Sequence, residues 1–124
     1  MRRSIGFSSV MVLILGLALA ACGGTPTGLN PEIRLSFEGS VTSAADGMPI
    51  QGAAVNFVNC ALGCRTKETT LTDAAGRYAL TVRERCALGT NPIFDSLEAV
   101  FGFRVAIARP VCTTATQTID FELE

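Results

Sequence analysis

Four cysteines in the C-terminal two thirds of the chain are the residues whose type and spacing most directly suggest chemistry. Cys60 and Cys64 are separated by three residues, whereas Cys86 and Cys112 each stand alone. Four thiols can form two disulfides or hold one zinc ion. Because structural zinc sites usually combine two closely spaced pairs of ligands, the spacing favours disulfides, with a Cys₄ zinc site as the alternative.

Side chains suited to catalysis are scarce. The chain has no histidine, which is the proton acceptor that enzymes use most often. Asp95 and Glu98 are close in sequence and could form a carboxylate pair, but acids in a loop usually belong to a solvated surface. Lys67 has no evident partner, and no glycine-rich phosphate loop is present. We therefore expect no catalytic residue, no cofactor and no metal, and predict that the protein is not an enzyme.

The first 21 residues have the composition of an export signal. Arg2 and Arg3 precede an almost wholly apolar run over residues 5–19. This run is short for a transmembrane helix, which needs about 20 apolar residues. It also ends in small residues, as cleaved signals do. We predict that residues 1–21 are a signal peptide.

The end of this segment carries a more specific motif. Leu19-Ala20-Ala21-Cys22 resembles the lipobox of bacterial lipoproteins at every position. The resemblance implies that a diacylglycerol is added to the Cys22 sulfur, that cleavage precedes Cys22, and that the new amine can be acylated, for example with palmitate. Each buried CH₂ contributes about 0.8 kcal/mol, so two or three acyl chains anchor firmly. Ordinary cleavage after Ala18-Leu19-Ala20 is the alternative.

A tether separates Cys22 from the rest of the chain. Residues 23–31 are rich in Gly, Pro and Thr and carry no charge, which is typical of a flexible linker. By resemblance to lipoprotein sorting in Gram-negative cells, Gly23 favours the outer membrane within the cell envelope. The expected organisation is a signal at 1–21, a lipidated N-terminus and tether at 22–31, and one domain at 32–124.

The charge balance argues against nucleic acid. Removing Arg2 and Arg3 with the signal would leave eight basic and eleven acidic residues, with no basic cluster. Nucleic acids and anionic lipid headgroups both select clustered Lys and Arg. We therefore expect contact with the membrane through the lipid on Cys22, and no nucleic-acid partner.

Export to an oxidising compartment strengthens the disulfide interpretation, because four cysteines remain once Cys22 carries lipid. Three pairings are compatible with four cysteines, and we favour Cys60–Cys64 within one loop and Cys86–Cys112 between strand ends. In the chain-entropy model these two would contribute about 2 and about 3.5 kcal/mol, respectively.

Alternation of apolar and polar residues predicts β-strands through most of the domain. Strands are expected at 32–41, 53–58, 67–72, 77–83, 97–100, 103–108 and 118–124. Their apolar sides carry Ile33, Leu35, Phe37, Val41, Ala53, Val55, Phe57, Tyr78, Leu80, Val82, Phe103, Val105, Ile107, Ile119, Phe121 and Leu123. Between strands, Asp73 is expected to cap a tight hairpin turn in which Gly76 adopts positive φ. The pattern predicts an all-β fold, an antiparallel β-sandwich of about seven strands.

Three motifs in order suggest a family. Phe37-Glu38-Gly39-Ser40-Val41, then residues 47–55 (GMPIQGAAV), then residues 70–80 (TLTDAAGRYAL), resemble the carboxypeptidase regulatory-like domain. The resemblance implies a transthyretin-like sandwich of seven strands. Such domains serve as accessory or interaction modules on peptidases, outer-membrane receptors and surface proteins. The segment 83–108 departs most from the family pattern, because it contains Cys86 and a longer loop at 87–96.

That loop is the candidate binding element. Long loops on a rigid scaffold often carry function, and we hypothesise that Ile93 and Phe94 contact a protein partner in the envelope. Alternatively, Phe94 folds back and plugs the open end of the sandwich. A carbohydrate-binding module is the alternative function, although the chain has no Trp and its one Tyr, Tyr78, lies on the expected core face. Phe94 and Phe101 would then be the exposed aromatic residues.

Overall fold

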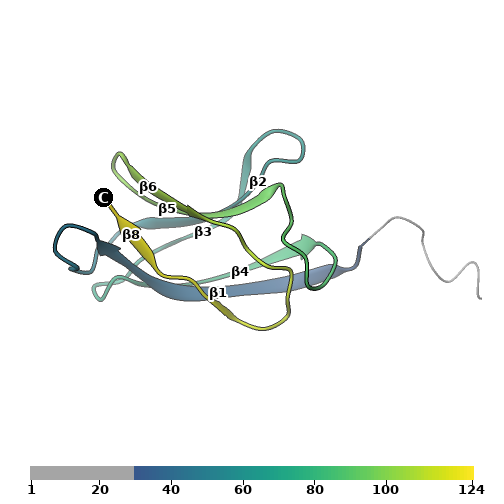
Figure 1. Ribbon diagram of the computed structural model, residues 1–124, viewed down its shortest axis with the longest axis horizontal. Coiled ribbons are helices and arrows are strands. Elements are labelled where there is room, and N and C mark those ends of the chain that lie inside the picture. Colours follow the sequence, from purple (N-terminus) through teal and green to yellow (C-terminus); the bar gives the residue numbers. More distant parts are fainter. Residues whose placement is uncertain (1–29) are drawn as a thin grey trace, which may run out of the picture.

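The computed structural model describes residues 30–124, which form two β-sheets packed face to face (Figure 1). The strands are β1 (Glu32–Ser43), β2 (Ala54–Asn59), β3 (Arg65–Leu71), β4 (Arg77–Arg85), β5 (Asp95–Phe101), β6 (Arg104–Ala108), β7 (Gln117–Thr118) and β8 (Phe121–Leu123). The predicted all-β sandwich is confirmed. The predicted signal peptide, Cys22 and most of the tether lie outside the described residues. Within residues 30–124 no helix could cross a membrane.

The first sheet is built around β1. Strand β4 pairs antiparallel with β1 from Glu32–Arg85 to Ser40–Arg77. On its other side, β1 pairs with β7 and then with β8, and both pairings are parallel. The expected last strand is therefore two short strands, and the sheet is mixed rather than purely antiparallel.

The second sheet has the order β3-β2-β5-β6, with every neighbouring pair antiparallel. In Figure 1 this layer lies above β1 and β4. The core fills the space between the layers. Within it the ring of Phe37 from β1 packs against the ring of Phe57 from β2, with 5.8 Å between the ring centroids. Alternate residues of β1, β2 and β4 are buried as predicted, because one face of each strand must cover this core.

Strand β6 contradicts the predicted alternation. Phe103, Val105 and Ile107 point away from the core and are exposed, whereas Ala106 and Ala108 pack against it. The two-residue turn at Gly102 and Phe103 fixes the register, so that Ala106 and Ala108 lie opposite the fully buried Ala99 and Leu97. Since paired residues share a face of the sheet, the larger side chains of β6 must face outward.

The turn at Asp73–Gly76 has the predicted hydrogen bonds and glycine conformation, but it does not join the expected pair of strands. The Asp73 carboxylate accepts hydrogen bonds from the backbone N–H groups of Ala75 and Arg77, each at 2.9 Å. Gly76 adopts a φ of +73°. However, β3 and β4 belong to different sheets, so the turn connects the two layers and does not close a hairpin.

The C-terminal segment runs directly against β1 at Gly39, between the pairings of β7 and β8. The backbone N–H of Ile119 donates to the Glu38 carbonyl at 2.9 Å, and the Tyr78 hydroxyl donates to the Ile119 carbonyl at 2.6 Å. Burial, together with the negative charge of Asp120, raises the pKa of Tyr78, so its hydroxyl remains a donor. A Cβ at position 39 would overlap the carbonyl group of Ile119. The glycine of the first motif therefore allows the last segment to dock.

We expect Gly39→Ala to lower the free energy of unfolding by roughly 1–3 kcal/mol, because the added methyl group must displace the segment at Ile119. Urea denaturation of Gly39→Ala and of the neighbouring control Glu38→Ala measures this. The control should change stability by less than about 0.5 kcal/mol. Equal stability of the two variants would contradict the close approach.

Two disulfides are present in the described part of the chain. Cys60 is bonded to Cys64, and Cys86 is bonded to Cys112, as favoured from the sequence. This pairing is incompatible with the alternative Cys₄ zinc site. The first bridge closes a short loop between β2 and β3, whereas the second joins the end of β4 to the segment between β6 and β7.

Replacing Cys86 and Cys112 together with Ala should lower the free energy of unfolding by about 3.5 kcal/mol, against about 2 kcal/mol for the pair Cys60 and Cys64, because the longer closed loop restricts the unfolded chain more. Denaturant titration of the two double variants gives the comparison. A larger loss for the Cys60 and Cys64 pair would show that loop length does not govern the effect.

Candidate interaction site

The loop between β4 and β5 is tied to the segment that follows β6. In addition to the Cys86–Cys112 disulfide, the N–H of Gly89 donates to the Cys112 carbonyl at 2.8 Å. The N–H of Cys112 in turn donates to the Thr90 carbonyl at 2.7 Å. These bonds fix the first half of the loop.

The second half is held by the other sheet. The N–H of Cys60 donates to the Phe94 carbonyl at 2.8 Å, and the Arg109 guanidinium donates to the Ile93 carbonyl at 2.8 Å. The backbone at both predicted binding residues is therefore fixed by neighbours that are distant in sequence.

The side chains of these two residues remain accessible. Ile93 is 74% exposed and Phe94 is 52% exposed, so Phe94 does not fill the end of the sandwich as a plug. Both residues line an open depression of about 420 Å³. Asn30, the first described residue, lines the same depression, so the N-terminal end of the domain lies beside the loop.

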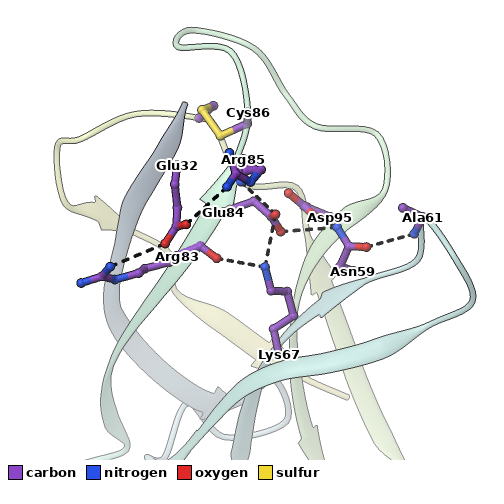
Figure 2. A network of polar contacts seen from close by, with 10 residues as sticks. Glu32, Asn59, Ala61, Lys67, Arg83, Glu84, Arg85, Cys86 and Asp95 are labelled. Atoms are coloured by element: carbon purple, nitrogen blue, oxygen red, sulfur yellow. Dashed lines mark hydrogen bonds and ion pairs between the residues drawn. A yellow bond between two sulfur atoms is a disulfide. The ribbon is translucent and has the colours of Figure 1, made fainter. Parts of the chain in front are cut away.

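A cluster of polar side chains lies next to this loop and connects the two sheets (Figure 2). The Asn59 amide donates to Asp95 at 2.6 Å and to Glu84 at 3.4 Å. Lys67 forms an ion pair with Glu84 at 3.2 Å and also donates to the Arg83 carbonyl. Glu84 comes from β4 in the first sheet and also accepts from the backbone N–H of Arg85, whereas its side-chain partners, Asn59 and Lys67, come from the second sheet.

Asp95 differs most from the sequence-based expectation. It was expected on a solvated surface, with a carboxylate pair to Glu98 as the alternative, but it is only 1% exposed. Glu98 lies on the opposite face of β5, because the two positions differ by an odd number. Burial raises the pKa of Asp95 to about 6; the hydrogen bond from Asn59 opposes this shift, and the negative charge of Glu84 adds to it.

Sequence reasoning missed the remaining members of the cluster, Asn59 and Glu84, and found no partner for Lys67. A usable signal was present. Glu84 continues the buried alternation of Tyr78, Leu80 and Val82, and Asp95 has the same parity as the buried Leu97. A charged residue at a core position of a strand predicts a buried polar network.

The cluster couples two carboxyl groups to one ammonium group and one amide. Across residues 30–124, no three His, Cys, Asp or Glu side chains are grouped so that they could hold a metal ion. Every buried side-chain nitrogen and oxygen in this part of the chain has a hydrogen-bond partner. Its hydrogen bonds and its ion pair connect the ends of β4 and β5 to β2 and β3.

The raised pKa of Asp95 predicts a pH-dependent stability. Because folding favours the protonated carboxyl group, its contribution is fully present below the unfolded-state pKa of 3.8 and is lost as pH rises through about 6. We expect this group alone to lower the free energy of unfolding by roughly 1 kcal/mol between pH 5 and pH 7.

Asp95→Asn provides the matched control, because its amide can accept from Asn59 and donate to Glu84 without carrying charge. Urea denaturation at pH 5 and pH 7 should show a smaller pH dependence for Asp95→Asn than for the unaltered chain, and higher stability at pH 7. An identical pH dependence would exclude Asp95 as its source.

No family model matches the chain, and a search of curated proteins finds no match. Among solved structures, the C-terminal domain of shaft pilin SpaA from Lactobacillus rhamnosus GG is similar, with 10% identity, a TM-score of 0.45, and coverage of 73% of this chain and 98% of that one. A 9R-lipoxygenase from Cyanothece shares 13% identity with a TM-score of 0.40, over 79% of this chain and 16% of that one. Because neither TM-score reaches 0.5, these likenesses support no inference about function.

Proposed function

We propose that the protein is a non-catalytic interaction module of the bacterial cell envelope, anchored through lipid on Cys22 and contacting an envelope protein through Ile93 and Phe94. The observation that carries the proposal is the combination of a fixed backbone and exposed apolar side chains at these two residues. A contact surface whose backbone is already ordered loses little entropy on binding.

The position of Asn30, the first described residue, supports a partner close to the membrane. Residues 23–29 separate Cys22 from Asn30, and a fully extended chain of this length spans at most about 28 Å. Because Asn30 lines the same depression as Ile93 and Phe94, lipid on Cys22 would keep this end of the domain near the bilayer. A membrane-associated envelope protein is therefore the partner that this geometry fits.

The motif residues support placing the domain in the carboxypeptidase regulatory-like class. Gly39 admits the C-terminal segment, Asp73 caps a turn, Gly76 has positive φ, and Tyr78 packs in the core with its hydroxyl bonded. All four roles are structural, which agrees with a module that performs no chemistry. The alternative, a carbohydrate-binding module, has Phe94 and Phe101 as exposed aromatic residues, but Tyr78 is buried and the chain has no Trp, so we place it second.

We predict that a photoreactive phenylalanine analogue at position 94 of the membrane-anchored chain crosslinks to a discrete envelope protein. The same analogue at Met48, an exposed apolar residue in the β1–β2 connection, is the matched control and should give no such product. The double variant Ile93→Ser, Phe94→Ser, with the analogue moved to Leu88 in the same loop, should lose the product.

Thermal unfolding of this double variant separates binding from folding. Since both side chains are exposed, its stability should change by less than about 0.5 kcal/mol. A large loss of stability would contradict the exposure of the two side chains, and adducts with lipid alone, or equal products at positions 94 and 48, would contradict the protein contact.

A further inference from the structure

The outer face of the second sheet carries an apolar strip that no other part of residues 30–124 covers. One row crosses all four strands in the register of the sheet: Leu71, Ala54, Val100 and Val105. Ile107 lies beside Val105 on β6, and Phe103 at the adjoining turn is fully exposed. A contiguous exposed apolar surface of this kind marks a contact surface.

The strip reaches an open strand edge. Among the strands of residues 30–124, β6 pairs only with β5, in a continuous register from Phe101–Arg104 to Leu97–Ala108 without a bulge. An edge strand presents alternate backbone N–H and C=O groups that are free to pair with another strand. A flat edge beside an apolar face is therefore a template for strand addition.

The other long edges of the sandwich carry the features that prevent such pairing. Strand β3 bears Arg65, Lys67 and Glu68, and its register with β2 shifts at Lys67, which is the extra residue of a bulge opposite Phe57 and Val58. Strand β4 bears Arg83 and Arg85 at its exposed positions. Charged residues and bulges of this kind block edge-to-edge association.

Strand β6 has no comparable protection. Its single charged residue is Arg104, and the guanidinium of this residue lies over the ring of Phe101, 5.4 Å from the centroid, within the same hairpin. The charge is thus held at the end of the strand and leaves Val105 and Ile107 unobstructed.

We propose that this edge binds a second copy of the chain, with the two β6 strands antiparallel about a twofold axis at Ala106. This arrangement goes beyond the proposed partner contact and uses a different surface. In it, Val105 lies opposite the partner's Ile107, and Arg104 lies opposite the partner's Ala108. The two four-stranded sheets become one sheet of eight strands.

The sequence of β6 is complementary to itself in this register. Within Arg104–Ala108 each apolar residue of the outer face meets an apolar residue, and no two arginines are opposed. Aliphatic cross-strand pairs of this kind are favourable. Val105, which ends the apolar row of each copy, meets the partner's Ile107, so the two rows are offset by one side-chain pair across the axis; Ile107 itself lies opposite Glu98 within its own sheet.

A second strand fits the edge better than a lipid surface does. Placing the strip against a bilayer would remove water from the free N–H and C=O groups of β6 and leave them without partners. Pairing with another strand satisfies the same groups. Because five residues of edge contact fall below the usual size of a stable interface, about 800 Å² per partner, the dimer should depend on concentration.

The test introduces Ala106→Cys into the full chain and examines membranes of the expressing cells by non-reducing electrophoresis. At the twofold axis the two introduced thiols are adjacent, so we expect a covalent dimer that reduction removes. Ala79→Cys, at an exposed position on the β4 edge, is the control for random collision. No dimer for Ala106→Cys, or equal dimer for both, would overturn the proposal.

A second substitution locates the contact. Adding Ile107→Lys to Ala106→Cys should reduce the covalent dimer by about tenfold or more, since a lysine on an edge strand opposes pairing. Adding Leu71→Lys, an equally exposed residue at the far side of the strip, should leave it unchanged. Dimer that survives Ile107→Lys, or a crosslinked product containing a different polypeptide, would contradict the proposed arrangement.

The proposed dimer does not depend on the contact that Ile93 and Phe94 are proposed to make with an envelope protein. The double variant Ile93→Ser, Phe94→Ser should form the Ala106→Cys dimer normally, and a monomeric Ala106→Cys chain would leave the Phe94 crosslink intact. The two proposals can therefore fail separately.

Discussion

The Cys86–Cys112 disulfide lies at one end of the sandwich, where the end of β4, the β4–β5 loop and the segment after β6 meet. It joins the end of β4, in the first sheet, to the chain as it returns from β6, in the second. Hydrogen bonds between Cys112 and the residues Gly89 and Thr90 fix the first half of the β4–β5 loop beside this link, and bonds from Arg109 and Cys60 fix the backbone at Ile93 and Phe94. The domain has a modest core, so covalent closure replaces packing that a larger protein would supply. A rigid loop with exposed apolar tips is the consequence.

A buried polar cluster completes this end of the molecule. Asp95 begins β5 at the base of the loop, and its hydrogen bond from Asn59 connects it to β2. Glu84 and Lys67 extend the cluster across both sheets. Burying two carboxyl groups is unfavourable, and the amide and ammonium partners offset part of the penalty. The cluster therefore fixes the positions of the strand ends at the base of the loop. It lowers the free energy of unfolding, and this loss increases toward neutral pH as Asp95 ionises.

Local alternation predicted the sandwich, and turn chemistry predicted the roles of Asp73 and Gly76, although not that their turn joins the two sheets. The count of thiols predicted two disulfides and left three pairings, of which the favoured one is present. Prediction from the sequence failed where tertiary contacts override local pattern. The apolar residues of β6 satisfied the alternation rule, but the hairpin register with Leu97 and Ala99 placed the smaller side chains inward. Asp95 lies next to a loop, which suggested that it is exposed. However, it is separated by one residue from the buried Leu97 and therefore lies on the core face of β5. The parallel docking of β7 and β8 required the absence of a side chain at Gly39, which becomes evident only when the segments are brought together.

We propose that lipid on Cys22 holds a disulfide-fixed sandwich at the membrane. Peptide mass spectrometry of the protein extracted from its native membrane without reduction tests both parts directly. The account predicts an N-terminal peptide that begins at Cys22 and carries a diacylglyceryl group, together with linked peptides for Cys60–Cys64 and Cys86–Cys112. An unmodified N-terminus would contradict the anchor, and free thiols at the four remaining cysteines would contradict the fixed loop.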